Sequence, residues 1–264
     1  MNKISRREML KASGAMIAAT SLSGVNAFAS ESFLLSNTES AAGSSAKTIL
    51  IIGAHPDDPE TGCGGTMIKL AGAGHKVISV YFTRGERGIA GKGLDESAKI
   101  RTTEAENACR ILGAKPVFMS QTDGDTRIEP HSYLQMKQLI ESYKPDAVFT
   151  HWPIDGHRDH RNCSSLVFDV WRNSENPFEL YYFEVCTGRQ TMHFFPTDFV
   201  DITDVVKQKR EACFCHVSQQ IQTSYKEEHG RMEEFRGMQC GAEYAEGFVK
   251  FHKSIAKGSI LDVR

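Results

Sequence analysis

The chain has 264 residues, of which 24% are charged and 40% are hydrophobic, and its formal net charge is −2 at pH 7. This composition indicates an ordinary globular protein with one large core, and it excludes a chain built from repeats or low-complexity tracts. Because the net charge is slightly negative, the composition also argues against nucleic acid as a partner.

The first 29 residues predict an export signal. Residues 5–11 (SRREMLK) precede a small-residue apolar run at 12–22, and residues 27–29 (AFA) match a cleavage pattern. The adjacent arginines resemble the twin-arginine signal of bacteria. An ordinary secretory signal and an uncleaved N-terminal anchor are the alternatives. The apolar run is shorter than the roughly twenty residues that a membrane span needs, so we expect no stable span after cleavage.

Behind this signal we expect a flexible leader and then a single domain. Residues 30–46 are rich in Ser, Ala, Asn and Glu, as flexible leaders are, and residues 47–264 have globular composition. The signal predicts a periplasmic or otherwise exported protein. The chain has seven cysteines, an odd number without paired spacing, so most are expected to be buried thiols rather than disulfides.

The first predicted strand delivers a cluster of polar side chains. Residues 48–53 (TILIIG) have the apolar, β-branched pattern of a buried strand, and residues 54–60 (AHPDDPE) follow directly. In open α/β sheets, ligands bind at this end of the strands. His55 and Asp58 are spaced to face one metal ion, which leaves Asp57 as a candidate base. Alternatively, the same residues form a turn that caps the next helix.

Strands and helices alternate along the rest of the chain, as in an α/β protein. Residues 62–66 (GCGGT) are expected to form a turn before a helix that begins at Met67. Further strands are predicted at 76–83, 116–120, 146–150, 180–186 and 199–201, the last at an edge. Further helices are predicted at 95–112, 133–143, 159–171, 203–216 and 219–236.

A second group of potential ligands follows the strand at 146–150. Residues 151–160 (HWPIDGHRDH) contain three histidines and two aspartates. If the next helix begins at Asp159 and His160, His160 points into the pocket while Asp159 fixes a neighbouring imidazole. A third neutral ligand then completes a His-Asp-His set with an open position, as in catalytic zinc sites. The remaining histidines are expected to pack in the core or on the surface; they include His193, His216, His229 and His252.

Taken together, these segments resemble the PIG-L/LmbE family of metal-dependent de-N-acetylases. The resemblance extends over about residues 47–251. The matching motifs are AHPDDPE at 54–60, GCGGT at 62–66, TRGERG at 83–88, the R-x-x-E pair of Arg101 and Glu104, TDGD at 122–125, GHRDH at 156–160 and YAEGF at 244–248. The insertion of Pro59 departs from the plain form of the first motif and puts a role for Glu60 in doubt.

The resemblance implies a fold and a cofactor. The fold is α/β, a Rossmann-like three-layer α/β/α arrangement with a mostly parallel sheet in a single domain. The implied cofactor is a zinc ion, or another divalent metal, held by His55, Asp58 and His160.

The resemblance also implies roles for five further residues. Asp57 would be the general base, and His157, oriented by Asp159, would stabilise the oxyanion or protonate the leaving amine. Arg101 and Asp123 fall where the family contacts sugar substrates.

The expected function is therefore removal of an N-acetyl group from an N-acetylglucosamine-type sugar or glycoconjugate by an exported, zinc-dependent hydrolase. Two alternatives remain open. One is a metal-dependent hydrolase of another class, acting on a phosphorylated sugar or a non-sugar amide, although two-metal phosphatases usually need more ligands. The other is a non-catalytic glycan-binding module, which would be expected to lose Asp57 and His157 first.

Overall fold

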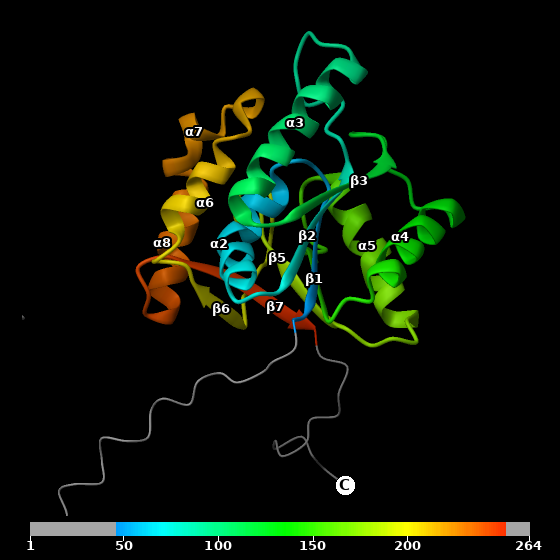
Figure 1. Cartoon of the computed structure of the whole chain (residues 1–264). Coiled ribbons are helices and arrows are strands. Elements are labelled where there is room, and N and C mark those ends of the chain that lie inside the picture. Colours follow the sequence, from blue (N-terminus) through cyan, green and yellow to red (C-terminus); the bar gives the residue numbers. More distant parts are fainter. Residues whose placement is uncertain (1–45, 252–264) are drawn as a thin grey trace, which may run out of the picture. The chain divides into compact units, whose positions relative to one another are not determined.

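The computed structural model describes residues 46–251, in which helices cover both faces of one seven-stranded sheet (Figure 1). The strand order is β3-β2-β1-β4-β5-β7-β6. The strands are β1 (Thr48–Gly53), β2 (Lys76–Thr83), β3 (Lys115–Gln121), β4 (Ala147–His151), β5 (Glu179–Phe183), β6 (Asp198–Asp201) and β7 (Ala245–Phe251). The predicted signal and leader lie outside the described residues, apart from residue 46.

Seven α-helices lie in the described part of the chain. They are α2 (Asp58–Gly72), α3 (Leu94–Leu112), α4 (Pro130–Tyr143), α5 (Arg158–Asn173), α6 (Val206–Cys213), α7 (Ile221–Ser224) and α8 (His229–Cys240). Two 3₁₀ turns, η1 (Val217–Gln219) and η2 (Tyr225–Glu227), join the last three helices. Between β1 and β5 the strands are parallel and alternate with helices, which confirms the predicted α/β class.

The central strand β1 is buried on both faces, which explains its continuous apolar sequence. Leu50 and Ile52 pack in a cluster with α4 and α5, including Met136 and Leu166. The alternate residues Ile49 and Ile51 belong to a second cluster with α2, α3 and α6; its members include Met67, Leu112 and Ala212. Because successive side chains of a strand point to opposite faces, β1 holds the two helix layers together.

The strand order contains a switch point beside β1. The chain runs from β1 outward through β2 to β3, and it then returns to form β4 on the other side of β1. The connections after β1 and β4 consequently leave the sheet in different directions and open a crevice at the carboxyl ends of these strands. Ligands of open α/β folds bind at this position. The two predicted ligand segments follow these two strands.

The start of α2 differs from the expectation. The helix begins at Asp58 rather than at Met67, so the glycines at 62, 64 and 65 lie inside its first half. They allow close packing there, since a Cβ atom at Gly62 would lie 2.6 Å from the Phe183 ring and one at Gly65 would lie 2.5 Å from Ile202. The glycines therefore serve helix packing against β5 and the segment after β6, and not a turn around a ligand.

The last part of the described region contains more, shorter helices than predicted. The helices expected at 203–216 and 219–236 are three separate helices joined by 3₁₀ turns. Strand β7, which the sequence analysis did not predict, pairs antiparallel with β5 and with β6. Strand β6 lies at the edge of the sheet, as expected.

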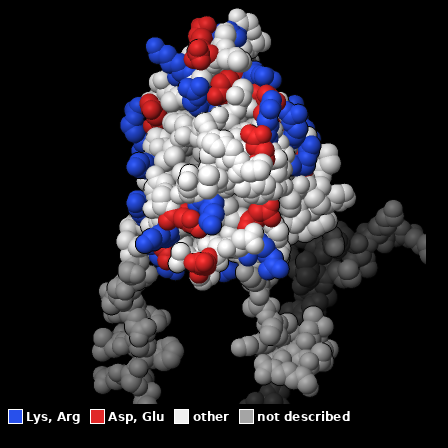
Figure 2. Space-filling model, turned by 90° about the vertical axis from the view of Figure 1, so that its right-hand side faces the viewer, with Lys and Arg blue, Asp and Glu red and all other residues white. Residues whose placement is uncertain are grey.

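The helices and the charged side chains of the described region bear on contact with membranes and with nucleic acid. None of the helices within residues 46–251 is long and apolar enough to cross a bilayer. On the face shown in Figure 2, Lys and Arg side chains alternate with Asp and Glu side chains. A surface of mixed sign does not create the one-sided field that attracts nucleic acid.

Candidate active site

A cavity of about 580 Å³ lies among the loops that follow the strands, and seven of the eight predicted site residues line it. They are His55, Asp57, Asp58, Arg101, Asp123, His157 and His160. The eighth, Asp159, is fully buried behind them. The structure thus brings together residues that lie up to about one hundred positions apart in the sequence.

The turn from β1 into α2 shapes the first wall of this cavity. Asp57 is the N-cap of α2 and has a left-handed backbone with φ 118°. This conformation is rare for a residue with a side chain, and its backbone N–H donates to Glu60 Oε2 at 3.2 Å. Gly53 allows the tight turn, because a Cβ atom there would lie 2.7 Å from Pro59 Cδ. Pro59 lies in the first helical turn, where its missing N–H costs nothing.

One carboxylate oxygen, Asp58 Oδ2, is the centre of the cluster. It lies 3.2 Å from His55 Nδ1, 3.3 Å from His160 Nε2 and 3.3 Å from His151 Nε2. The His55 backbone N–H also donates to it at 2.7 Å. Burial alone would raise the pKa of Asp58, but the charge of His160 and its hydrogen bond are among the causes that lower it well below its usual value. The carboxylate is therefore ionised.

The far nitrogen of His55 is held by two other carboxylates. His55 Nε2 lies 3.2 Å from Asp159 Oδ2 and 3.2 Å from Asp123 Oδ1. Asp159 is itself fixed by Gly124 N–H at 2.7 Å and by the Thr126 hydroxyl at 2.6 Å. The Asp159 carboxylate therefore orients His55, while the Asp159 backbone N–H donates to His157 Nδ1 at 3.3 Å; that Asp159 orients His157 in the reaction stays a prediction. Asp123, expected to contact substrate, lines the cavity but is also a partner of His55.

His160 has a similar partner in Asp155, which the sequence analysis missed. His160 Nδ1 lies 3.2 Å from Asp155 Oδ1, and the Asp155 side chain is fully buried. The Thr191 hydroxyl at 2.8 Å and the His157 N–H at 2.7 Å hold Asp155 in place. Burial alone would lower the pKa of His160, but Asp58 and Asp155 raise it to about 9. The only sequence signal for Asp155 was the density of His and Asp in its segment.

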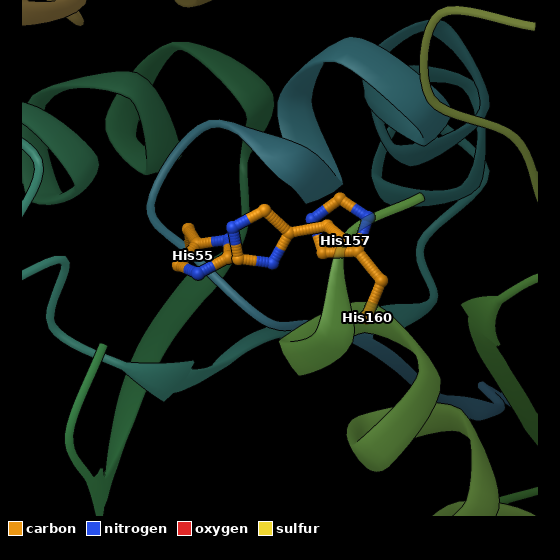
Figure 3. Close-up of side chains that lie close together, drawn as sticks. All are labelled: His55, His157 and His160. Atoms are coloured by element: carbon orange, nitrogen blue, oxygen red, sulfur yellow. The ribbon is translucent and has the colours of Figure 1, made fainter. Parts of the chain in front are cut away.

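The third imidazole of the cluster is that of His157, the N-cap of α5. Figure 3 shows its ring beside those of His55 and His160; the ring centroids lie 4.7 Å and 4.9 Å from it. Burial and the two neighbouring imidazoles lower the pKa of His157, so its ring is neutral. Because Nδ1 accepts from the Asp159 backbone N–H at 3.3 Å, the ring proton is on Nε2.

A fourth histidine, His151, lies deeper than the others at the end of β4. Its ring stacks on His160 with centroids 3.9 Å apart, and its Nε2 accepts from the Ala54 N–H at 2.9 Å. Burial lowers the pKa of His151 to about 4. This neutral ring joins β4 to the loop after β1 at the switch point. The sequence analysis gave it no role.

Asp57 is held by an arginine from α3. Arg101 Nη2 donates to Asp57 Oδ2 at 2.9 Å and also to the Pro56 carbonyl oxygen. The glycine-rich loop after β2 allows this approach, because Cβ atoms at Gly85 and Gly88 would lie 2.5 Å and 2.3 Å from Arg101 Nη1. Burial raises the pKa of Asp57 to about 6, against the opposing charge of Arg101. A direct contact of Arg101 with substrate stays a prediction.

The donor set is suited to a metal ion. Among the groups whose ligand atoms lie within 4.8 Å of one another, two contain His160, namely His55 with His157 and His160, and Asp58 with His151 and His160. The predicted ligands His55, Asp58 and His160 span both groups and meet at Asp58 Oδ2. The second ring nitrogens of His55 and His160 face carboxylates, as in carboxylate-histidine-metal arrangements, and nitrogen and oxygen donors suit zinc.

The fold and this cluster define an α/β protein with a candidate metal centre at the switch point of its sheet. A profile of the PIG-L family, described as GlcNAc-PI de-N-acetylase, matches residues 50–171, which contain both ligand segments. A diacetylchitobiose deacetylase from Thermococcus kodakarensis is 30% identical over an alignment of 190 residues, and the match covers 66% of this chain and 70% of that relative. The chain belongs to the PIG-L family.

Two solved structures share the fold. The N,N'-diacetylchitobiose deacetylase from Pyrococcus horikoshii, complexed with its inhibitor, superposes with a TM-score of 0.71 at 27% identity and covers 81% of this chain and 88% of its own. The 4-carboxy-2-hydroxymuconate hydratase GalB from Pseudomonas putida gives a TM-score of 0.70 at 23% identity, and the superposition covers 81% of this chain and 99% of the hydratase. Because the same fold carries a hydratase, the fold alone does not determine the reaction.

Proposed function

We propose that the protein is an exported zinc-dependent hydrolase that removes the acetyl group from an N-acetylglucosamine-type sugar or glycoconjugate. The observation that carries this proposal is the position of Asp58 Oδ2 between His55 and His160, beside Asp57, in one cavity. The 30% identity to a diacetylchitobiose deacetylase supports the reaction and the kind of substrate. The cavity volume of about 580 Å³ is within the range of small-molecule sites.

The residues of the cluster take different parts in the proposed reaction. His55, Asp58 and His160 would hold the zinc ion, which when bound polarises the acetyl carbonyl and acidifies the attacking water. Asp57, one oxygen of which is held by Arg101, accepts a proton from that water. Asp57 then delivers the proton to the leaving nitrogen. Acetate and a free amine are the products.

His157 is suited to the developing negative charge on the carbonyl oxygen. Its proton is on Nε2, because Nδ1 accepts from the Asp159 N–H. A neutral ring with a fixed donor that faces the cavity stabilises an oxyanion without giving up its proton. Between the two roles that the sequence left open, the structure therefore favours oxyanion stabilisation over protonation of the amine.

Export is the part of the proposal that rests on sequence alone. It is supported by the adjacent arginines Arg6 and Arg7 and by the AFA pattern at 27–29, all outside the described residues. Expressed in a bacterium with a twin-arginine pathway, the full chain should appear in the periplasm with Ser30 at its N-terminus. Replacing both arginines by lysine should keep it in the cytoplasm. An unprocessed cytoplasmic wild-type protein would contradict this part.

Product analysis tests the reaction and the substrate class. The purified protein would be incubated with N-acetylglucosamine, diacetylchitobiose, peptidoglycan fragments and glycopeptides, and with phosphorylated sugars, while acetate, free amine and phosphate are measured. We expect equimolar acetate and amine from at least one N-acetylated sugar, and none from Asp57→Asn. Phosphate release without acetate would instead support the phosphoesterase alternative.

A further inference from the structure

A second group of metal-ligating side chains lies in the wall of the same cavity. Cys186 follows β5, Glu228 is the N-cap of α8, and His229 is the first residue of that helix. All three line the cavity together with the His and Asp cluster. None of them contacts that cluster through a hydrogen bond or ion pair found among residues 46–251, so the group is a separate feature of the cavity.

The three side chains converge. One ligand atom from each lies within 4.8 Å of the others. The Cys186 sulfur is 3.6 Å from His229 Nε2 and 3.8 Å from Nδ1, and within the described residues the imidazole nitrogens of His229 have no other hydrogen-bond partner. Cys186 has a left-handed backbone with φ 46°, an uncommon conformation for cysteine that places its thiol at the cavity wall.

Two neighbouring side chains hold the Glu228 carboxylate. The Ser224 hydroxyl donates to Oε2 at 3.2 Å, and Arg189 forms an ion pair with Oε1. The Arg189 side chain is 74% exposed, so it moves aside at little cost. Displacement of Arg189 frees Oε1 for a cation, while the Ser224 hydroxyl still holds Oε2 in place.

We propose that Cys186, Glu228 and His229 form a second metal site, which binds a zinc-like transition metal ion with its open coordination position toward the cavity. Thiolate, imidazole and carboxylate together are the donors of zinc and cobalt, whereas calcium and magnesium require oxygen ligands. Binding converts the Cys186 thiol to a thiolate and releases its proton to solvent. Three protein ligands leave a place for water or for a polar group of a bound molecule.

The sulfur ligand separates this proposal from the proposed deacetylase site. His55, Asp58 and His160 supply only nitrogen and oxygen, so a thiolate-to-cobalt charge-transfer band in the near-ultraviolet reports a sulfur ligand outside that site, and its loss in Cys186→Ser would assign it to Cys186. The band is expected whether or not the protein releases acetate from a sugar. Failure of one proposal therefore leaves the other testable.

The experiment is a titration of the metal-free full chain with Co²⁺, followed by absorption spectroscopy and by metal analysis after gel filtration. We expect two bound equivalents and a near-ultraviolet band that saturates at one sulfur-bound cobalt per chain. Cys186→Ser should lose the band and one equivalent. Cys240→Ser replaces an exposed cysteine and is the matched control, which should keep the band and both bound equivalents. His229→Gln should weaken binding at this site by tenfold or more.

A measurement on the wild-type protein keeps the test informative if Cys186→Ser does not fold. Zn²⁺ should slow alkylation of Cys186, followed by mass spectrometry of its peptide, while Cys240 reacts at an unchanged rate. A wild-type protein that shows no sulfur-to-cobalt band at saturation would overturn the proposal. So would equal alkylation of Cys186 with and without zinc, or a band that persists in Cys186→Ser.

Discussion

The carboxylate of Asp155 gives the sharpest test of how the candidate metal centre is built. Asp155 Oδ1 lies 3.2 Å from His160 Nδ1, and the Asp155 side chain is fully buried. Asp155→Asn preserves the shape and one acceptor oxygen but removes the negative charge that makes the imidazole a stronger ligand. Loss of such an outer carboxylate typically costs 10- to 100-fold in metal affinity, or about 1.4–2.7 kcal/mol.

The assay for this variant is competition for Zn²⁺ with a chromophoric chelator at fixed pH. We expect Asp155→Asn to raise the zinc dissociation constant of the site that contains His160 by 10- to 100-fold. Asp125→Asn is the matched control, because the Asp125 side chain is 47% exposed, pairs with Arg127 and lies outside the cluster; the zinc affinity of this variant should equal that of the wild type. A thermal unfolding curve would check that Asp155→Asn is folded. Wild-type zinc affinity in a folded Asp155→Asn protein would refute the reasoning.

The remaining predictions concern catalysis and stability. Asp57→Asn should retain bound metal and lose most turnover, whereas His160→Ala should lose metal first; metal analysis beside acetate release separates them, and near-normal rates in Asp57→Asn would contradict the assignment of the base. Lys209→Met should lower the free energy of unfolding by about 3–5 kcal/mol in urea denaturation, because Glu233 and Glu246, 3.0 Å and 2.8 Å from the Lys209 amino group, would stay buried without that partner; an unchanged urea midpoint would contradict this. Burial alone would raise the pKa of Glu233, but Lys209 and hydrogen bonds lower it below its ordinary value of 4.5. The ionised Glu233 carboxylate therefore stabilises the fold above pH 4.5, and this stabilisation is lost as the pH falls through the lowered pKa. Glu233→Gln should make the free energy of unfolding depend less on pH on the acid side.

Much of the fold was predictable because its signals are local. The strand at 48–53 has a continuous apolar run, and the helix predicted at 95–112 ends at Leu112, directly before Gly113 with its left-handed φ of 70°. The start of α2 was not predictable, because three glycines normally disfavour a helix interior. They are tolerated there because neighbours such as Phe183 and Ile202 occupy the space that their side chains would fill. Strand β7 depends on pairing with strands far away in the sequence.

The candidate site was predictable as a set of residues but not as a network of contacts. Two motifs placed His and Asp at strand ends, and the switch point brings those ends together. The relative position of β1, β3 and β4 decides which carboxylate faces which imidazole. Neither motif predicts that position. Hence the contact of the Asp159 carboxylate with His55 was not predicted, and Asp155 received no role. Cys186 and His229 meet only through the packing of α8.

Acetate release from diacetylchitobiose and related N-acetylated sugars, before and after metal removal, tests the central claim most directly. The protein would be assayed as purified, after dialysis against a chelator, and after return of Zn²⁺ to saturation. The account predicts acetate release that disappears with the metal and recovers with zinc, with one free amine formed for each acetate. Acetate release that continues in the metal-free protein, or its complete absence from the zinc-loaded protein, would contradict a metal-dependent sugar deacetylase.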